Sequence, residues 1–165
     1  MSDSLPWVSG CERGLDIVMV EPRLLFVYGT LMSTASGSMG RGPRARLDRA
    51  SRTMGRAAVR GFLFDLGVYP GLVLKLRGAV PGGEARVFGE LRELIEPGDV
   101  FDWLDRYEGI TCEVDAKDGC DYRRVVRDVA RLDASGRQVV MPAWIYVYEG
   151  PLVGARLLPD GIWPP

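Results

Sequence analysis

The segment LLFVYGTL (residues 24–31) is the most informative stretch for the fold. Five apolar or aromatic residues in a row, followed at once by Gly29, are typical of a short buried strand that runs into a turn. Residues 32–43 are rich in serine and glycine and predict a loop. We therefore expect a central buried strand over residues 24–28.

The segment EPGDVFDWLDRYEG (96–109) predicts the clearest helix of the chain. Asp99 is the expected N-cap, and Gly109 is the expected C-terminal stop. Four apolar residues recur at helical spacing and form one face of this helix: Val100, Trp103, Leu104 and Tyr107.

The remaining segments predict mostly strands. We expect a helix over residues 44–53, strands over 56–66, 72–76 and 85–91, a hairpin of 124–132 and 138–148 joined by a turn at 133–136, and a proline-rich tail over 157–165. Strands without regular alternation with helices are typical of an α+β fold with a barrel-like sheet, and not of a doubly wound one.

Composition limits the class of protein. The chain has 165 residues, 47% of them hydrophobic, and its 21 basic and 22 acidic residues give a net charge of -1 and a pI near 5.6. This balance argues against nucleic acid or an anionic membrane as the main partner. No stretch resembles a transmembrane span or a signal peptide, so we expect a cytoplasmic protein.

The domain organisation is simple. We expect residues 1–20 to form a poorly ordered leader and residues 21–165 to form a single domain; whether Met19 is the native start stays open. The three cysteines (Cys11, Cys112 and Cys120) form no CxxC pair, so we predict neither a disulfide framework nor a zinc site.

The sequence contains no histidine. This excludes Ser-His-Asp and Cys-His catalysis, histidine-bound metals and the commonest general base. Phosphate-binding and dinucleotide-binding glycine motifs are also missing from the sequence. Any chemistry must therefore use carboxylates, tyrosine, hydroxyl or thiol groups, basic side chains or backbone amides, and we expect no metal and no cofactor.

Four segments, in this order and spacing, resemble the gamma-glutamylcyclotransferase-like superfamily, of the gamma-glutamylamine cyclotransferase type. They are VYGTL (27–31), GFLFDLGVYPGLV (61–73), FGELREL with FDWLDRYEG (88–94 and 101–109), and YRR with AWIYVY (122–124 and 143–148). VYGTL alone is a weak signal, whereas VYGTL with a downstream LDxYEG and a later YxR is specific. The resemblance implies a small mixed β-barrel with flanking helices.

The resemblance also implies the site residues and the reaction. The loop Tyr28, Gly29, Thr30 and Leu31 would bind a gamma-glutamyl group, Glu108 would be the acid/base residue, and Tyr122 matches a tyrosine near the pocket. The implied reaction converts a gamma-glutamyl amine or peptide to 5-oxoproline and a free amine.

Physical chemistry supports a carboxylate in this role. A gamma-glutamyl amide carries its own nucleophile, the alpha-amine, so an effective molarity of roughly 10⁵ M or more can replace a protein nucleophile. One base must carry a proton from this amine to the leaving nitrogen. Glu108 lies at the expected C-terminus of a helix, where the negative end of the helix dipole raises the pKa of a carboxyl group.

Several alternatives stay open at this point. The same fold can serve as a non-catalytic ligand-binding or regulatory domain, and an RNA-binding barrel would use the arginines of residues 41–60, which more simply form a solvated face. Asp105 and Glu113 are the nearest competitors of Glu108, and Asp105 is expected on the solvated side of its helix. The leaving amine (amino acid, glutathione, lysine isopeptide, or carrier- or antibiotic-linked amine), the oligomeric state and the role of residues 1–20 are also left open.

Overall fold

The computed structural model describes residues 22–76, 85–110 and 121–164. The expected leader, the predicted loop at 78–83 and all three cysteines lie outside these residues. No helix in the described ranges is long and apolar enough to cross a membrane.

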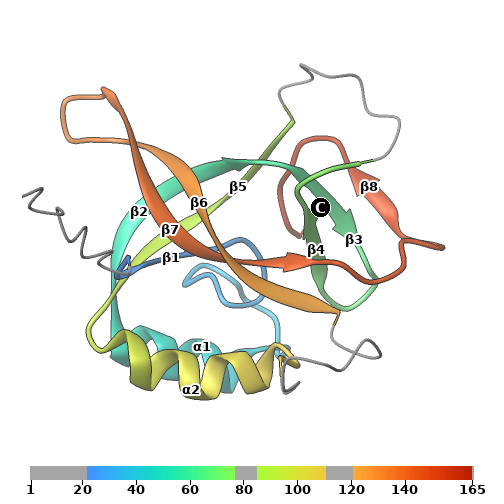
Figure 1. Ribbon diagram of the computed structural model, residues 1–165, viewed down its shortest axis with the longest axis horizontal. Coiled ribbons are helices and arrows are strands. Elements are labelled where there is room, and N and C mark those ends of the chain that lie inside the picture. The colour runs from blue at the N-terminus through green and yellow to red at the C-terminus, as the bar shows by residue number, and fades with distance from the viewer. Residues whose placement is uncertain (1–21, 77–84, 111–120, 165) are drawn as a thin grey trace, which may run out of the picture.

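Five strands form a closed barrel (Figure 1). Around the barrel their order is β1 (Leu24–Val27), β5 (Arg86–Leu94), β2 (Ser51–Arg60), β6 (Tyr122–Leu132) and β7 (Gln138–Tyr148). The barrel is mixed, because β1 runs parallel to β7 while all other neighbours are antiparallel. The predicted α+β fold with a small mixed barrel and flanking helices is confirmed.

Strand β1 is buried on both faces, as its continuous apolar sequence predicted. Phe26 packs with the cluster that fills the barrel interior, whereas Leu25 and Val27 pack with the cluster beneath the helices. Successive side chains of a strand point to opposite faces, so a strand between two apolar layers needs apolar residues at every position.

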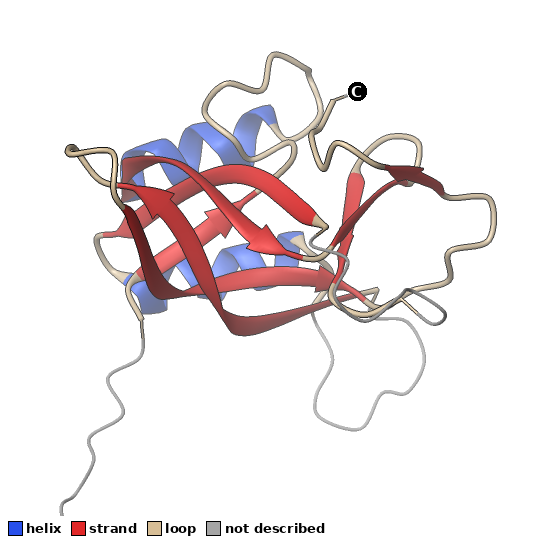
Figure 2. Cartoon of the chain, turned by 90° about the horizontal axis from the view of Figure 1, so that it is seen from above, coloured by secondary structure: helices blue, strands red, loops and turns tan. Residues whose placement is uncertain are grey.

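Two helices, α1 (Arg41–Ala50) and α2 (Pro97–Tyr107), lie beside each other on one side of the barrel (Figure 1). The view from above shows the strands crossing over both helices (Figure 2). The predicted limits of α1, residues 44–53, were wrong by one turn, because Ser51 already pairs with Leu94 of β5. That pairing depends on the barrel and leaves no trace in the local sequence.

The N-terminus of α2 also differs from the prediction. Glu96 is the N-cap, Pro97 is the first helical residue, and Asp99 lies two residues further inside the first turn instead of capping it. Proline suits the first turn because its missing N–H would have no partner there. The C-terminal stop at Gly109 is confirmed by its left-handed backbone, with φ of 78°.

A second sheet of three strands lies at one end of the barrel. Its order is β4 (Pro70–Val73), β3 (Phe62–Asp65) and β8 (Arg156–Leu158). The single strand predicted over residues 56–66 was wrong: the chain leaves the barrel at Gly61 and continues into this second sheet. The predicted tail contributes β8, whereas the β6–β7 hairpin is confirmed with an earlier start of β6.

Candidate active site

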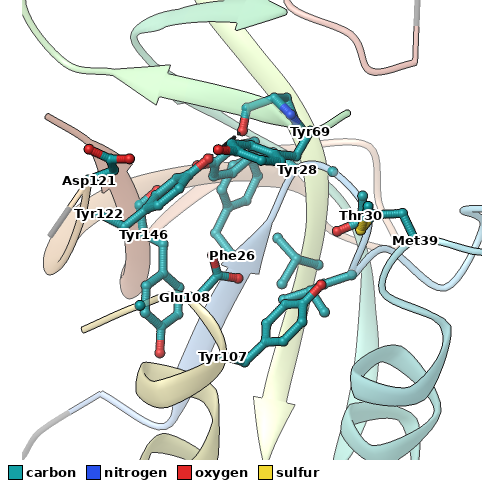
Figure 3. Close-up of a pocket in the computed structure, with 15 residues that line it drawn as sticks. Phe26, Tyr28, Thr30, Met39, Tyr69, Tyr107, Glu108, Asp121, Tyr122 and Tyr146 are labelled. Atoms are coloured by element: carbon teal, nitrogen blue, oxygen red, sulfur yellow. Dashed lines mark hydrogen bonds between the residues drawn. The ribbon is translucent and has the colours of Figure 1, made fainter. Parts of the chain in front are cut away.

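A cavity of about 360 Å³ lies where β1 ends, between the C-terminus of α2 and the start of β4 (Figure 3). Its lining includes all six residues singled out from the sequence: Tyr28, Gly29, Thr30, Leu31, Glu108 and Tyr122. The structure therefore brings these residues together, while their individual roles stay predictions.

A Schellman motif fixes the position of Glu108 at the end of α2. The N–H of Gly109 donates to the carbonyl of Arg106 at 3.2 Å, and the N–H of Ile110 donates to the carbonyl of Asp105 at 2.8 Å. Glu108 itself is the C-cap residue. Figure 3 shows its side chain reaching from the helix end toward the cavity, with Tyr28 and Tyr122 across from it.

The surroundings of Glu108 favour its protonated form. Burial is the main cause and the negative charge of Asp105 the second, and together they raise the pKa of Glu108 from 4.5 to about 7. The expected direction of the shift is confirmed, but its causes are burial and the charge of Asp105 in place of the helix dipole. A carboxyl group with a pKa near 7 can both accept and donate a proton at neutral pH.

Asp105 is not a solvated carboxylate, contrary to the prediction from its place on the helix. The Tyr146 hydroxyl donates to Asp105 Oδ1 at 2.6 Å, and Arg124 Nη2 donates to Asp105 Oδ2 at 3.1 Å. Residues three apart on a helix are neighbours, which places the Asp105 charge beside Glu108. Arg124 stacks in turn against the rings of Phe101 and Trp144.

The loop after β1 carries backbone N–H groups that have no acceptor in the described part of the chain. The Gly29 carbonyl accepts from the N–H of Met32 at 3.0 Å, which closes a tight turn over residues 29–32. Among the described residues, the backbone N–H groups of Gly29, Thr30 and Leu31 donate no hydrogen bond. Successive unpaired N–H groups are suited to an oxygen that carries negative charge.

Gly29 is required by packing against β4. A Cβ atom at this position would lie 2.6 Å from Cγ and 3.0 Å from Cδ of Pro70, which is too close for any real contact. Gly29 thus lets Pro70, another lining residue, close over the loop. The group that approaches Gly29 closely within the protein is therefore a proline ring.

Tyrosines form much of the cavity wall. The Tyr122 hydroxyl donates to the carbonyl of Pro70 at 2.9 Å, and the Tyr28 hydroxyl donates to the carbonyl of Tyr146 at 2.7 Å. Burial raises the pKa of both phenols, so they stay neutral.

The cavity is also lined by residues that the sequence patterns did not single out. Among them are Tyr107, which belongs to the apolar face predicted for α2, and Tyr146, Met39 and Asp121. Burial raises the pKa of Tyr107, and the Thr30 side chain lies near its hydroxyl. Tyrosine at helix or strand spacing carries no local sign of which face meets a cavity.

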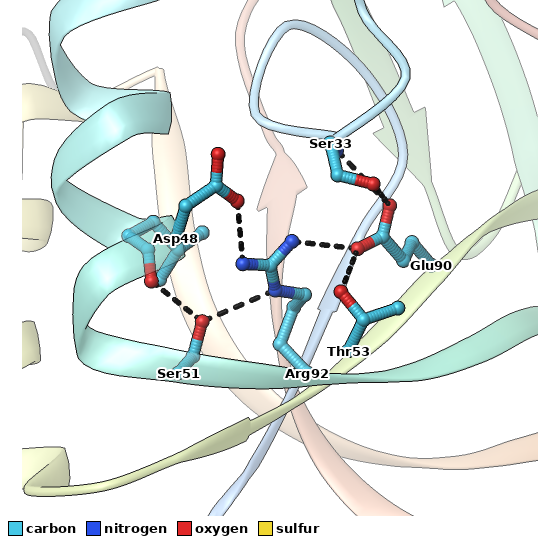
Figure 4. A network of polar contacts seen from close by, with 7 residues as sticks. Ser33, Asp48, Ser51, Thr53, Glu90 and Arg92 are labelled. Atoms are coloured by element: carbon cyan, nitrogen blue, oxygen red, sulfur yellow. Dashed lines mark hydrogen bonds and ion pairs between the residues drawn. The ribbon is translucent and has the colours of Figure 1, made fainter.

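A polar network around Glu90 and Arg92 holds the same loop at Ser33, directly after the turn at residues 29–32 (Figure 4). Glu90 Oε2 accepts hydrogen bonds from the N–H of Ser33 at 3.0 Å and from its Oγ at 2.7 Å. Glu90 Oε1 accepts from Arg92 Nη1 at 2.6 Å and from Thr53 Oγ1 at 3.0 Å. Arg92 is only 1% exposed and also donates to Asp48 at 2.6 Å.

Metal binding has no support from the described part of the chain. No group of three histidine, cysteine, aspartate or glutamate side chains lies there in a position to hold a metal ion. Glu113, another carboxylate close to the predicted site in sequence, lies outside the described residues.

Comparison with known structures shows the same fold in other proteins. YkqA from Bacillus subtilis aligns with a TM-score of 0.55 and 22% identity over 87% of this chain, which spans 40% of the length of YkqA. An AIG2-like protein from Mus musculus aligns with a TM-score of 0.51 and 22% identity over 77% of each chain. A search of curated proteins found no significant match.

Family models give the more specific result. The model described as "Gamma-glutamyl cyclotransferase, AIG2-like" matches residues 25–165, which contain the whole cavity described above. The chain therefore belongs to the AIG2-like gamma-glutamyl cyclotransferase family.

Proposed function

We propose that this protein converts a gamma-glutamyl amide to 5-oxoproline and a free amine, with Glu108 as the general acid and base. The observation that carries the proposal is the meeting, in one cavity, of a carboxyl group with a pKa near 7 and a loop with unpaired backbone N–H groups. Family membership supports cyclotransferase chemistry in general terms.

The proposed reaction is a transfer within the substrate. The alpha-amino nitrogen attacks the side-chain carbonyl carbon as a free amine and loses a proton to the Glu108 carboxylate. Glu108 then gives this proton to the leaving nitrogen as the carbon–nitrogen bond of the amide breaks. Positioning replaces a protein nucleophile, because both reacting groups belong to one molecule.

Negative charge develops on the carbonyl oxygen during this attack. The lining of the cavity carries two carboxylates, Glu108 and Asp121, and no lysine or arginine side chain among the described residues. Stabilisation of the oxyanion therefore falls to the backbone N–H groups of residues 29–31. The buried rings of Tyr28 and Tyr146 form part of the wall and lower the local dielectric, which strengthens these hydrogen bonds.

The test is a panel of gamma-glutamyl amides with neutral, acidic and basic leaving amines, scored for release of 5-oxoproline. Replacing Glu108 by Gln keeps the shape of the side chain but removes the proton carrier, so we expect the rate to fall by about 10²–10⁴-fold. Glu96→Gln, at the other end of the same helix, is the matched control and should keep its activity.

Two outcomes would overturn the proposal. One is an active wild type whose Glu108→Gln variant retains the full rate. The other is a wild-type protein that binds 5-oxoproline yet releases none from any amide in the panel, which would favour a binding or regulatory domain. Urea unfolding of each variant separates a loss of chemistry from a loss of fold.

A further inference from the structure

Arg44 is the one exception in the arginine-rich segment 41–60, whose other arginines are exposed as expected for a solvated face. Arg44 is only 8% exposed and lies in α1, against the loop that follows β1. Burying a guanidinium group is costly unless its N–H donors find acceptors. This cost raises the question of what Arg44 does there.

Among the described residues, the guanidinium group of Arg44 donates only to carbonyls of this loop. Nη1 donates to the carbonyl of Thr30 at 2.7 Å, and Nη2 donates to the carbonyl of Gly37 at 3.1 Å. A second, longer contact joins Nη1 to the carbonyl of Met39 at 3.5 Å. One planar side chain thus ties the turn at residues 29–32 to the second half of the loop.

Because a peptide group is planar, the hydrogen bond from Arg44 to the Thr30 carbonyl also fixes the direction of the Leu31 N–H. The carbonyl of Thr30 and the N–H of Leu31 belong to one trans peptide group, so they point in opposite directions. Because Arg44 holds the carbonyl, the Leu31 N–H must point away from α1. The N–H of Thr30 is fixed in the same way, since the Gly29 carbonyl is held by Met32.

We propose that Arg44 is a positioning residue, which aims the Leu31 N–H at the carbonyl oxygen of the bound gamma-glutamyl group. Arg44 is not among the residues that line the cavity, so in this role it acts through the Thr30–Leu31 peptide. Without the guanidinium group this peptide is free to rotate, and a rotated peptide would replace a donor by a carbonyl oxygen that repels the oxyanion. This inference rests on the proposed function and extends it to a residue outside the cavity.

The kinetic test is Arg44→Met, which keeps the length of the side chain and removes the donors. We expect kcat to fall by about 10²–10³-fold, the usual effect of losing one oxyanion donor, with KM nearly unchanged. The pH profile should keep its position, because the raised pKa of Glu108 comes from burial and from Asp105. Arg44→Lys, which can still reach the Thr30 carbonyl, should recover part of kcat.

Leu47→Ala is the control for stability. Leu47 is fully buried one turn further along α1, so this variant weakens the same helix without touching the loop carbonyls. We expect it to lower the melting temperature while kcat stays close to that of the wild type. An equal loss of kcat in Leu47→Ala and Arg44→Met would overturn the proposal, as would an Arg44→Met variant with normal kcat.

A spectroscopic readout keeps the inference testable apart from turnover. In isotope-labelled wild type, 5-oxoproline should shift the Leu31 amide resonance, and in Arg44→Met this shift should disappear. An unchanged response in the variant would overturn the positioning role. If the wild type releases no 5-oxoproline, the proposed function fails, while a crystal structure of Arg44→Met still decides whether the Thr30–Leu31 peptide depends on Arg44.

Discussion

At the scale of single residues, the pKa of Glu108 depends in part on one neighbouring carboxylate, Asp105, whose charge a substitution can remove. Asp105 lies one helical turn before Glu108 and contributes its negative charge to the raised pKa of about 7. Arg124 and the Tyr146 hydroxyl hold Asp105 in place. Asp105 is thus close enough to tune the proton carrier without lining the cavity.

We predict that Asp105→Asn moves the acidic limb of the kcat/KM profile to lower pH. Glu108 must be ionised to accept the first proton, so activity falls below its pKa. Removing a nearby negative charge makes ionisation easier and lowers that pKa. The shift should not reach the ordinary value of 4.5, because burial, the larger cause, remains.

The matched control for this change is Asp102→Asn, an exposed carboxylate on the same helix. Its profile should coincide with that of the wild type. An Asp105→Asn profile that keeps its position, or that moves to higher pH, would contradict the coupling between the two carboxyl groups.

At the scale of elements, the turn after β1 and the start of β4 form one packed unit. The ring of Pro70 occupies the space that a side chain at Gly29 would need, and the Pro70 carbonyl accepts from Tyr122 of β6. The turn that presents the N–H groups is therefore held from outside by a strand of the second sheet.

We predict that Gly29→Ala destabilises the protein by about 1–3 kcal/mol, because the added methyl group must displace Pro70. The same displacement should lower kcat/KM. Gly42→Ala is the contrasting variant: no atom lies within 4 Å of its added Cβ, and alanine favours helix α1 by about 0.5–1 kcal/mol. Urea unfolding should show a lower free energy of unfolding for Gly29→Ala and a higher one for Gly42→Ala. A change in the same direction in both variants would contradict the role given to Pro70 packing.

At the scale of the whole molecule, one buried ion network ties the layers together. Arg92 and Glu90 of β5 connect to Asp48 of α1, to Ser51 and Thr53 of β2, and to Ser33 of the loop (Figure 4). Partners of such a network satisfy each other, so the loss of one member leaves a charge buried without its counterpart.

We predict that Arg92→Met lowers the free energy of unfolding by about 3–5 kcal/mol, because Glu90 is then left buried without its cation. Adding Glu90→Gln should recover part of this loss, since the neutral amide can still accept hydrogen bonds. A double-mutant cycle by urea unfolding measures the coupling. Strictly additive losses would contradict a coupled pair.

Much of the site followed from short stretches of sequence. The strand and turn at 24–31, the helix that ends at Glu108 and the family motifs each depend on neighbouring residues, so their order along the chain is sufficient to find them. The limits of α1 and the break at Gly61 could not be found in this way. Both depend on pairing with strands that are distant in the sequence: β2 with β5 at the end of α1, and β3 with β8 after Gly61.

The sequence by itself thus determined the α+β class, the strand–turn and helix-end segments of the site, and the family resemblance. Only the tertiary structure decided which polar residues are buried and what they contact. Closure of the barrel brings Tyr28 to Tyr146, 118 positions away, and folding of the loop onto α1 buries Arg44. An arginine or aspartate on a helix has the same local pattern whether it faces water or a carbonyl, so its role appears only when the layers pack.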